Sequence, residues 1–322
     1  MAGKTFFLIL LLFILVPFGL KGEEKRIRKE TFVYSVKGAD TLRMDRYDIV
    51  GDTVGKPCVI FMFGGGFYTG ARDLDGYVGF LEFLAAEGYT VASIDYRLGF
   101  KNIAHTGNNK RFGFCDFMCL FQNTITMAVE DLFDATNFVL ENSADWGINP
   151  ELIVTCGSSA GAITVLQGEY ERCNRTLVAQ ALPPDFSYAG VISFAGAVFS
   201  DHGHLEWNGT PAPVMLFHGD ADKNVPYSKL KLFNLAFFGS EYLARKYEKN
   251  GSPFYFHVEE NADHRIAGSP LSENRGEILG FLQKYVMEKQ QLQTRVTVTS
   301  VDKPVVKKNF GIRTYIETNL GK

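Results

Sequence analysis

Apolar residues along the chain fall into two alternating patterns. Short, nearly continuous apolar runs predict strands buried on both faces, and they lie at residues 57–63, 89–97, 152–156, 188–198, 213–217 and 253–258. Between and after these runs, apolar residues recur at helical spacing at residues 76–88, 123–142, 162–170, 225–238, 241–248 and 273–288. Strands that alternate with helices in this way favour a mainly parallel sheet with helices on both faces. We therefore predict an α/β fold without internal repeats.

The two ends of this region differ from its centre. Residues 31–36 and 42–50 predict two antiparallel strands joined by a turn at residues 37–40. Residues 295–320 begin with alternating valine and threonine, which indicates one or two short polar strands. This segment is either an edge addition to the sheet or a loosely held tail. We treat residues 291–322 as a C-terminal extension to which the pattern assigns no role.

Residues 1–22 have the composition of a secretory signal peptide. Lys4 precedes an almost unbroken apolar stretch at residues 6–20, and the chain turns polar from Lys21 onward. The stretch is short for a membrane span, which needs about 20 apolar residues. We predict cleavage near Gly22, export to the periplasm or the exterior, and no stable membrane insertion afterwards. An uncleaved membrane anchor is the alternative.

Charge and cysteine content exclude several partners. The 322 residues carry a formal net charge of −3, so we expect no nucleic-acid partner. The five cysteines are an odd number, and at least one must stay unpaired within a monomer. Cys156 ends a buried run, whereas Cys115 and Cys119 are four residues apart and are the best candidates for a local disulfide. No histidine accompanies them at metal-ligand spacing, so we predict neither a metal site nor a cofactor.

The clearest chemical signal is a G-x-S-x-G motif at residues 157–161, between the apolar run at 152–156 and the helical pattern at 162–170. Strand, motif and helix in this order predict a sharp turn that exposes the central serine at the top of the sheet. The nucleophile is then Ser159, and its neighbour Ser158 is expected to point elsewhere. The start of the following helix supplies free N–H groups for a developing negative charge.

A nucleophilic serine needs a base, and the base needs an acidic partner that orients it. Asp222 follows the predicted strand at 213–217, and His264 follows the one at 253–258. Carboxyl ends of parallel strands meet at one edge of a sheet, so both side chains are expected beside Ser159. Asp220 is a rival for the acidic role.

Several motifs in this order resemble the α/β-hydrolase superfamily, and within it the serine esterases and lipases of the carboxylesterase kind. The resemblance extends from about residue 31 to residue 288, and it implies an α/β-hydrolase catalytic domain over residues 23–290. Its motifs are Gly64-Gly65-Gly66-Phe67, Asp95-Tyr96-Arg97-Leu98, Gly157-Ser158-Ser159-Ala160-Gly161, His218-Gly219-x-x-Asp222-x-x-Val225-Pro226 and Asp263-His264.

The resemblance implies a role for each position. Ser159 would attack an ester carbonyl, His264 would accept and return the proton, and Asp222 would hold the imidazole. The spacing of the acid motif selects Asp222 over Asp220, and His218 would be structural. The oxyanion hole would use the backbone N–H groups of Ala160 and of Gly65 or Gly66.

Two departures from the family pattern stand out. Phe63 occupies the position before the glycines, where many relatives have a histidine that is usually structural. The phenylalanine-rich segment at residues 99–122 matches nothing in the family pattern, and long connections of this kind are usually functional or disordered. It is either a lid that shapes the substrate pocket or a surface flap packed on its own aromatic side chains.

The resulting hypothesis is a secreted serine carboxylic ester hydrolase that acts through an acyl-enzyme on a small acyl ester, with a carbohydrate as one candidate alcohol. A lipase, an amidase or a peptidase of the same fold is an alternative. A second alternative, from another class, is a non-catalytic binding protein on a hydrolase scaffold. The filled serine, acid and histidine positions argue against the latter.

Overall fold

The computed structural model describes residues 26–51, 54–101, 114–301, 304–306, 308 and 310–320. The predicted signal peptide lies outside these residues. Within them, no helix combines the length and the apolar character needed to cross a membrane.

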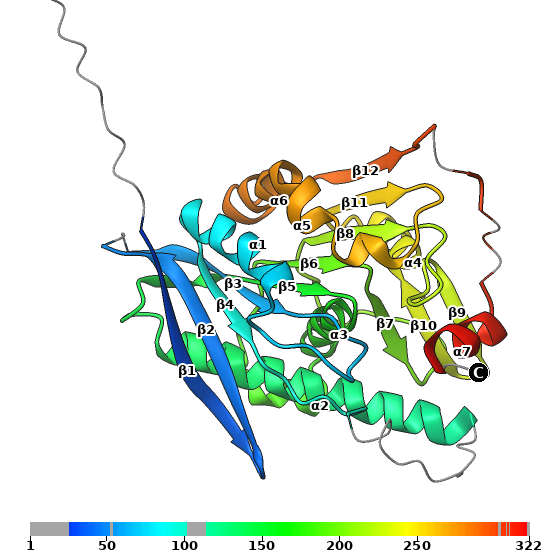
Figure 1. The fold of residues 1–322 in the computed structure, drawn as a ribbon, viewed down its shortest axis with the longest axis horizontal. Coiled ribbons are helices and arrows are strands. Elements are labelled where there is room, and N and C mark those ends of the chain that lie inside the picture. The colour runs from blue at the N-terminus through cyan, green and yellow to red at the C-terminus, as the bar shows by residue number, and fades with distance from the viewer. Residues whose placement is uncertain are drawn as a thin grey trace, which may run out of the picture.

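A nine-stranded sheet forms the centre of the molecule, with the strand order β1-β2-β4-β3-β5-β6-β8-β11-β12 (Figure 1). Its strands are β1 (Ile27–Lys37), β2 (Asp40–Ile49), β3 (Lys56–Met62), β4 (Thr90–Ile94), β5 (Ile148–Ser158), β6 (Gly190–Phe194), β8 (Val214–Gly219), β11 (Phe254–Glu259) and β12 (Gln293–Val298). The strands from β4 to β12 pair in parallel, whereas β1, β2 and β4 pair antiparallel. Both the parallel sheet and the antiparallel N-terminal entry are confirmed.

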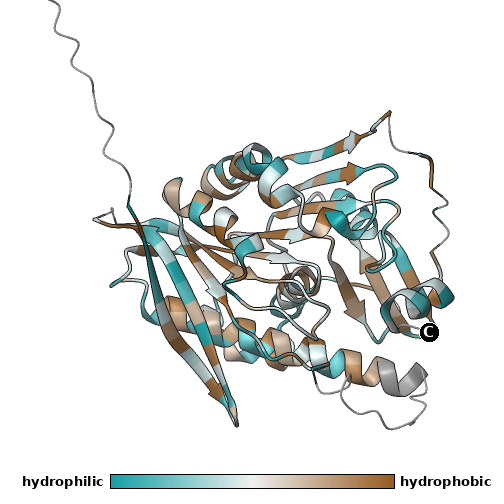
Figure 2. Cartoon of the chain, viewed as in Figure 1, coloured by the Kyte–Doolittle hydropathy of each residue, from teal (hydrophilic) through white to brown (hydrophobic). Residues whose placement is uncertain are grey.

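Burial follows the position of each strand in the sheet. Every residue of β4, β6 and β8 is buried, as expected for strands covered on both faces. The edge strand β1 is much more exposed, whereas β2 beside it is buried over most of its second half. Figure 2 shows hydrophilic and hydrophobic residues alternating along this outer hairpin. The hydropathy pattern therefore separates the central strands from the edge.

Helices cover both faces of the sheet. They are α1 (Asp75–Ala86), α2 (Phe114–Glu141), α3 (Ala160–Asn174), α4 (Ser240–Asn250), α5 (Pro270–Glu273), α6 (Arg275–Phe281) and α7 (Ile312–Leu320), with 3₁₀ turns at Val178–Ala181 and His264–Ala267 and a π-helical turn, η3, at Leu282–Met287. The chain moves from β3 to β4 through α1 and from β5 to β6 through α3, in opposite directions along the sheet. Because such crossovers are right-handed, α1 and α3 lie on opposite faces. Helix α5 contacts α1, and α2 packs on α3, which gives three layers (Figure 1).

The predicted helix at residues 225–238 is wrong. The chain there forms β9 (Lys229–Leu232) and β10 (Leu235–Gly239), which join β7 (Ala197–Ser200) in a small antiparallel sheet. The residues of β9 alternate between lysine and leucine, and this period of two is the signature of a half-exposed strand. Phe233 turns the hairpin with φ +54.

The predicted loop at residues 99–122 is shorter than expected, because α2 begins at Phe114. Residues 102–113 of this segment, expected to be either a lid or a surface flap, lie outside the described residues. The predicted disulfide is also wrong, since Cys119 has a free, exposed thiol in α2. Side chains four residues apart in a helix have Cβ atoms about 5–6 Å apart, whereas a disulfide needs about 3.5–4.5 Å.

The C-terminal extension forms the last strand of the nine-stranded sheet, β12, and helix α7. Strand β12 pairs in parallel with β11, so of the two alternatives for this segment the edge addition is correct for residues 293–298. Helix α7 then lies near the hairpin β9–β10 at the end of the molecule where α2 begins (Figure 1). The chain therefore returns to the main domain after the sheet is complete.

Candidate active site

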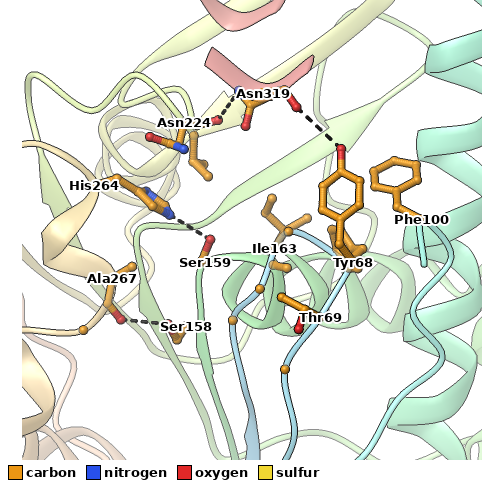
Figure 3. A pocket seen from close by; sticks show the side chains of 18 of the residues that line it. Tyr68, Thr69, Phe100, Ser158, Ser159, Ile163, Asn224, His264, Ala267 and Asn319 are labelled. Atoms are coloured by element: carbon orange, nitrogen blue, oxygen red, sulfur yellow. Dashed lines mark hydrogen bonds between the residues drawn. The ribbon is translucent and has the colours of Figure 1, made fainter. Parts of the chain in front are cut away.

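A cavity of about 700 Å³ lies beyond the carboxyl ends of the parallel strands. It is lined by the loop after β3, by the start of α3, and by the loops after β8 and β11. This is the edge where ligands bind in open α/β sheets. Figure 3 shows Ser159, His264 and Asn224 facing this space.

The turn between β5 and α3 has the geometry of a nucleophile elbow. Ser159 has φ +50 and ψ −112, a backbone conformation that non-glycine residues rarely adopt. A Cβ on Gly157 would lie 2.4 Å from the carbonyl group of Gly161, and a Cβ on Gly161 would lie 2.2 Å from the oxygen of Met62. Both glycines are therefore needed for the close approach of α3 to the sheet.

The three side chains of the predicted triad are in contact. The Oγ atom of Ser159 lies 2.8 Å from Nε2 of His264, and Nδ1 of His264 lies 2.7 Å from Oδ2 of Asp222. Ser158 points elsewhere, because its hydroxyl donates to the carbonyl oxygen of Ala267 at 2.8 Å. The structure thus brings together Ser159, His264 and Asp222, which are far apart in the sequence.

Asp222 is held in place by several donors. Its Oδ1 accepts hydrogen bonds from the N–H groups of Asn224 and Val225 at 2.8 and 3.1 Å, and Nε2 of His218 lies 3.4 Å from its Oδ2. Burial alone would raise the pKa of this carboxyl group, but hydrogen bonds from His218 and His264 outweigh burial and hold the pKa well below its ordinary value. Asp222 therefore stays charged beside the imidazole.

The rival acid, Asp220, faces away from the histidine. Its Oδ1 accepts from the N–H of Asn261 at 2.7 Å, and its Oδ2 binds the ammonium group of Lys308. It therefore joins the acid loop to the histidine loop and to the C-terminal segment. The fully buried His218 donates or accepts at Ser240 Oγ, 2.7 Å away, which agrees with a structural position.

The glycine-rich loop after β3 lines the same cavity. Gly65 has φ +142 and Gly66 has φ +62, and a Cβ on Gly65 would lie 2.0 Å from the carbonyl oxygen of Thr69. Ala160, on the other side of Ser159, is the first residue of α3, so its N–H has no acceptor within the helix. All three predicted oxyanion residues therefore line the same cavity as Ser159.

Phe63 occupies the position where many relatives have a histidine, and it packs among apolar groups. Its ring is buried and stacks on Tyr96 at a centroid distance of 4.5 Å. The hydroxyl of Tyr96 donates to the carbonyl oxygen of Phe63 at 2.8 Å. A Cβ on Gly70 would lie 2.4 Å from the Phe63 ring, so the loop packs directly on this side chain.

Three residues at the cavity were missed by the sequence analysis. Tyr77, in the first turn of α1, has a hydroxyl oxygen that accepts from the N–H of Gly64 at 3.0 Å. Tyr315 and Asn319, on α7, line the cavity although they lie more than 50 residues beyond His264. No motif marks these three positions, because their contacts arise only from the tertiary arrangement.

The chain is similar to known esterases over part of its sequence. It is 31% identical over 111 residues to Gut esterase 1 of Caenorhabditis elegans, a match that covers 34% of this chain and 18% of that protein. It is 30% identical over 127 residues to the acetylcholinesterase of Bungarus fasciatus, covering 39% of this chain and 19% of the other. The matched segment thus spans about a fifth of the length of these relatives. No protein-family model matches the chain.

Solved structures match over most of the chain. Thermogutta terrifontis esterase 2 in its propionate-bound form is 19% identical and has a TM-score of 0.58, with 82% of this chain and 95% of that chain covered. Its apo form has a TM-score of 0.57 at 19% identity. The chain has the α/β-hydrolase fold. The fold that the ordered motifs predicted is thereby confirmed, and esterases are among both the sequence relatives and the structural neighbours of the chain.

Proposed function

We propose that this α/β-hydrolase is a serine carboxylic ester hydrolase that acts through an acyl-enzyme. The observation that carries the proposal is the continuous hydrogen-bonded chain from Ser159 through His264 to Asp222, at the wall of a cavity. Nucleophile, base and orienting acid within hydrogen-bond reach are the arrangement required for acyl transfer.

The first half of the proposed reaction acylates the serine. Nε2 of His264 takes the proton of the Ser159 hydroxyl as Oγ attacks the ester carbonyl carbon. The imidazolium then donates this proton to the oxygen of the leaving alcohol, and the bond between the carbonyl carbon and that oxygen breaks. Asp222 keeps the ring oriented and stabilises its positive charge, since the carboxylate stays ionised.

The second half releases the acid. His264 takes a proton from a water molecule, the water oxygen attacks the acyl carbon, and the proton returns to Oγ of Ser159. In both halves the negative charge on the former carbonyl oxygen would be held by the N–H groups of Ala160 and of Gly65 or Gly66. Removing one such donor typically costs about 3–4 kcal/mol of transition-state stabilisation.

The size of the cavity supports a small acyl ester as the substrate. About 700 Å³ is within the usual range for sites that bind small molecules. The neighbouring Thermogutta terrifontis esterase 2 has been solved with propionate and with butyrate bound. We propose an acyl chain of similar length for this enzyme.

We further propose a carbohydrate as the alcohol. Arg265 and Asn224 provide polar groups at the cavity lining next to His264, where the alcohol must leave. The side chain of Arg265 is 80% exposed, so it can donate to sugar hydroxyl groups. Faster hydrolysis of an acetylated monosaccharide than of ethyl acetate, lost in Arg265→Ala, would support this assignment, and equal rates would contradict it.

The domain organisation completes the proposal. Residues 1–22 would direct export and be removed, residues 23–290 would form the catalytic domain, and residues 291–322 would be an extension of it. The exported protein is then expected to begin near Glu23. Intact mass spectrometry after expression in a secreting host checks this start, and a product that retains residues 1–22 would favour the anchor.

Hydrolysis of p-nitrophenyl acetate, butyrate and octanoate tests the catalytic assignment. Ser159→Ala is expected to lower kcat/KM by about a thousandfold or more, as for loss of a triad member. Ser158→Ala is the matched control, because its hydroxyl bonds to Ala267 rather than to the base. It should retain activity within about tenfold, since one hydrogen bond is worth about 1 kcal/mol. Wild-type protein that hydrolyses none of the three esters and resists a fluorophosphonate would instead be a binding protein on a hydrolase scaffold.

A further inference from the structure

Helix α7 reaches the candidate active site from the far end of the sequence. Tyr315 and Asn319 line the cavity together with Ser159 and His264. We infer that α7 closes the acyl end of this cavity, and that Tyr315 limits the length of the acyl chain that the enzyme accepts. The inference rests on the proposed function, since it assigns the substrate group that this part of the cavity holds.

Asn319 connects two loops of the site. Its Nδ2 donates to the carbonyl oxygen of Asn224 at 3.1 Å, and the hydroxyl of Tyr68 donates to its backbone carbonyl oxygen at the long distance of 3.5 Å (Figure 3). Asn224 belongs to the acid loop, two residues after Asp222, and Tyr68 belongs to the glycine-rich loop. The helix therefore spans the cavity from one loop to the other.

Tyr315 joins a cluster of aromatic side chains. The residue is 5% exposed. The centroid of its ring lies 5.7 Å from that of Phe237, which packs edge-on against Phe121 at a centroid distance of 5.1 Å. Phe121 contacts Phe100 at 5.4 Å, and Phe100 contacts Tyr68 at 5.2 Å. Four of these side chains also line the cavity, and we call them the aromatic end: Tyr68, Phe100, Phe121 and Tyr315.

The chain that leads to α7 is bound to the histidine loop and to the acid loop. The N–H of Val306 donates to Oδ1 of Asn261 at 3.1 Å, and Lys308 binds the carboxylate of Asp220. Strand β12 fixes the start of this path by pairing with β11. Within the described residues of the extension, β12, Val306 and Lys308 each contact the rest of the molecule before α7 begins.

The position of His264 identifies which part of the substrate meets the aromatic end. The leaving alcohol must lie at Nε2 of His264, because that atom supplies its proton. Figure 3 shows His264 on one side of Ser159, with Tyr68 and Phe100 on the other. The side of the cavity away from His264 therefore holds the acyl chain, and its aromatic walls suit a hydrocarbon.

Acyl-chain selectivity tests the inference. We compare kcat/KM for p-nitrophenyl octanoate with kcat/KM for p-nitrophenyl acetate. This ratio should rise about tenfold or more in Tyr315→Ala and after deletion of residues 311–322. A hydrophobic pocket typically changes the relative rates of two substrates by about tenfold or more for each methylene group that it admits or excludes. Tyr315→Trp should lower the ratio for butyrate over acetate. Arg313→Ala is the matched control on the same helix, since this side chain is 92% exposed, and it should leave every ratio unchanged.

Unchanged ratios in Tyr315→Ala, in the deletion variant and in Tyr315→Trp would overturn the inference. Thermal unfolding identifies any variant that does not fold, and the remaining variants then decide. Acetate esters of methanol, butanol and octanol test the assigned side of the cavity. Their relative rates should be the same in wild type and Tyr315→Ala, and a shift in this series instead of the acyl series would overturn the acyl assignment.

A binding measurement separates this inference from the proposed function. Calorimetry measures the affinity for octanoate and for acetate without turnover. We would compare Ser159→Ala with the double variant Ser159→Ala, Tyr315→Ala. Octanoate should bind about tenfold more tightly once Tyr315 is shortened, with acetate unchanged. Inert wild-type protein would remove the proposed function, and the octanoate result would still decide whether α7 closes the cavity. Equal octanoate affinity would overturn the inference.

Discussion

The two ends of the cavity are built in different ways. At the polar end, Ser159, Asp222 and His264 each follow the end of a parallel strand within about five residues. The aromatic end is assembled from the glycine-rich loop, the chain after β4, helix α2 and helix α7. The groups proposed for bond making thus come from short motifs in chain order, whereas the wall proposed to fit the substrate comes from segments scattered along the sequence.

This comparison divides substitutions into two kinds. A change at the polar end should lower turnover of every ester by a similar factor, because it acts on a step common to all of them. A change at the aromatic end should alter the ranking of esters with smaller effects on the best one. The predictions below test the first kind, from the largest expected effect to the smallest.

Asp222→Asn is expected to have the largest effect. An amide cannot stabilise the imidazolium and favours the wrong tautomer of His264, so kcat should fall by about 1000- to 10 000-fold. Asp220→Asn is the matched control two residues away, because its carboxylate contacts Asn261 and Lys308 instead of the histidine. Its kcat should stay within about tenfold of wild type. Equal losses in the two variants would mean that the acid has been assigned to the wrong residue.

Gly65→Ala should lower kcat for all esters by about 100- to 1000-fold, the cost of a lost oxyanion donor. The added Cβ would lie 2.0 Å from the oxygen of Thr69, so the loop must move. Gly76→Ala, in α1, is the control, since its Cβ would meet nothing within 4 Å. Steady-state kinetics on three acyl chain lengths checks both the size of the loss and its uniformity. A loss confined to long chains would place Gly65 in acyl binding instead.

Tyr77→Phe should have the smallest effect of this series. It removes the hydroxyl oxygen that accepts from Gly64, a hydrogen bond worth about 1 kcal/mol, which corresponds to about a fivefold loss in kcat. The comparison variant is Tyr242→Phe. Tyr242 belongs to α4, and its ring packs on Phe238 of β10. Wild-type kinetics in Tyr77→Phe would show that the loop is held without this contact.

The same division explains what the sequence could predict. Ser159, Asp222 and His264 are predictable because each residue type lies shortly after a recognisable strand, and the resemblance to the family's acid motif selects Asp222 over Asp220. The roles of these residues remain proposals, but their meeting in space follows from the sheet topology. The role of the glycine-rich loop was implied by the resemblance to the α/β-hydrolase motifs.

The aromatic end could not be found in this way. In the segment that contains Tyr315 and Asn319, the only recognisable pattern is the alternation of valine and threonine at its start. Both residues contact parts of the chain that are far away in the sequence. The prediction of a helix at 225–238 is wrong because isolated leucines fit both the helical period and the strand period. Pairing with β7 stabilises the strand. The pairing of Cys115 with Cys119 rested on spacing alone, which carries no information on whether the two residues lie in a helix.

The most direct test of the account is the site of covalent labelling by a fluorophosphonate. Mass spectrometry of the digested protein should show one modified peptide, with the adduct on Ser159, and Ser159→Ala should remain unlabelled. Ser158→Ala should label as wild type does, because its hydroxyl faces Ala267. An adduct on another residue, or no adduct at any concentration that labels known serine esterases, would contradict the assignment of Ser159 as an activated nucleophile.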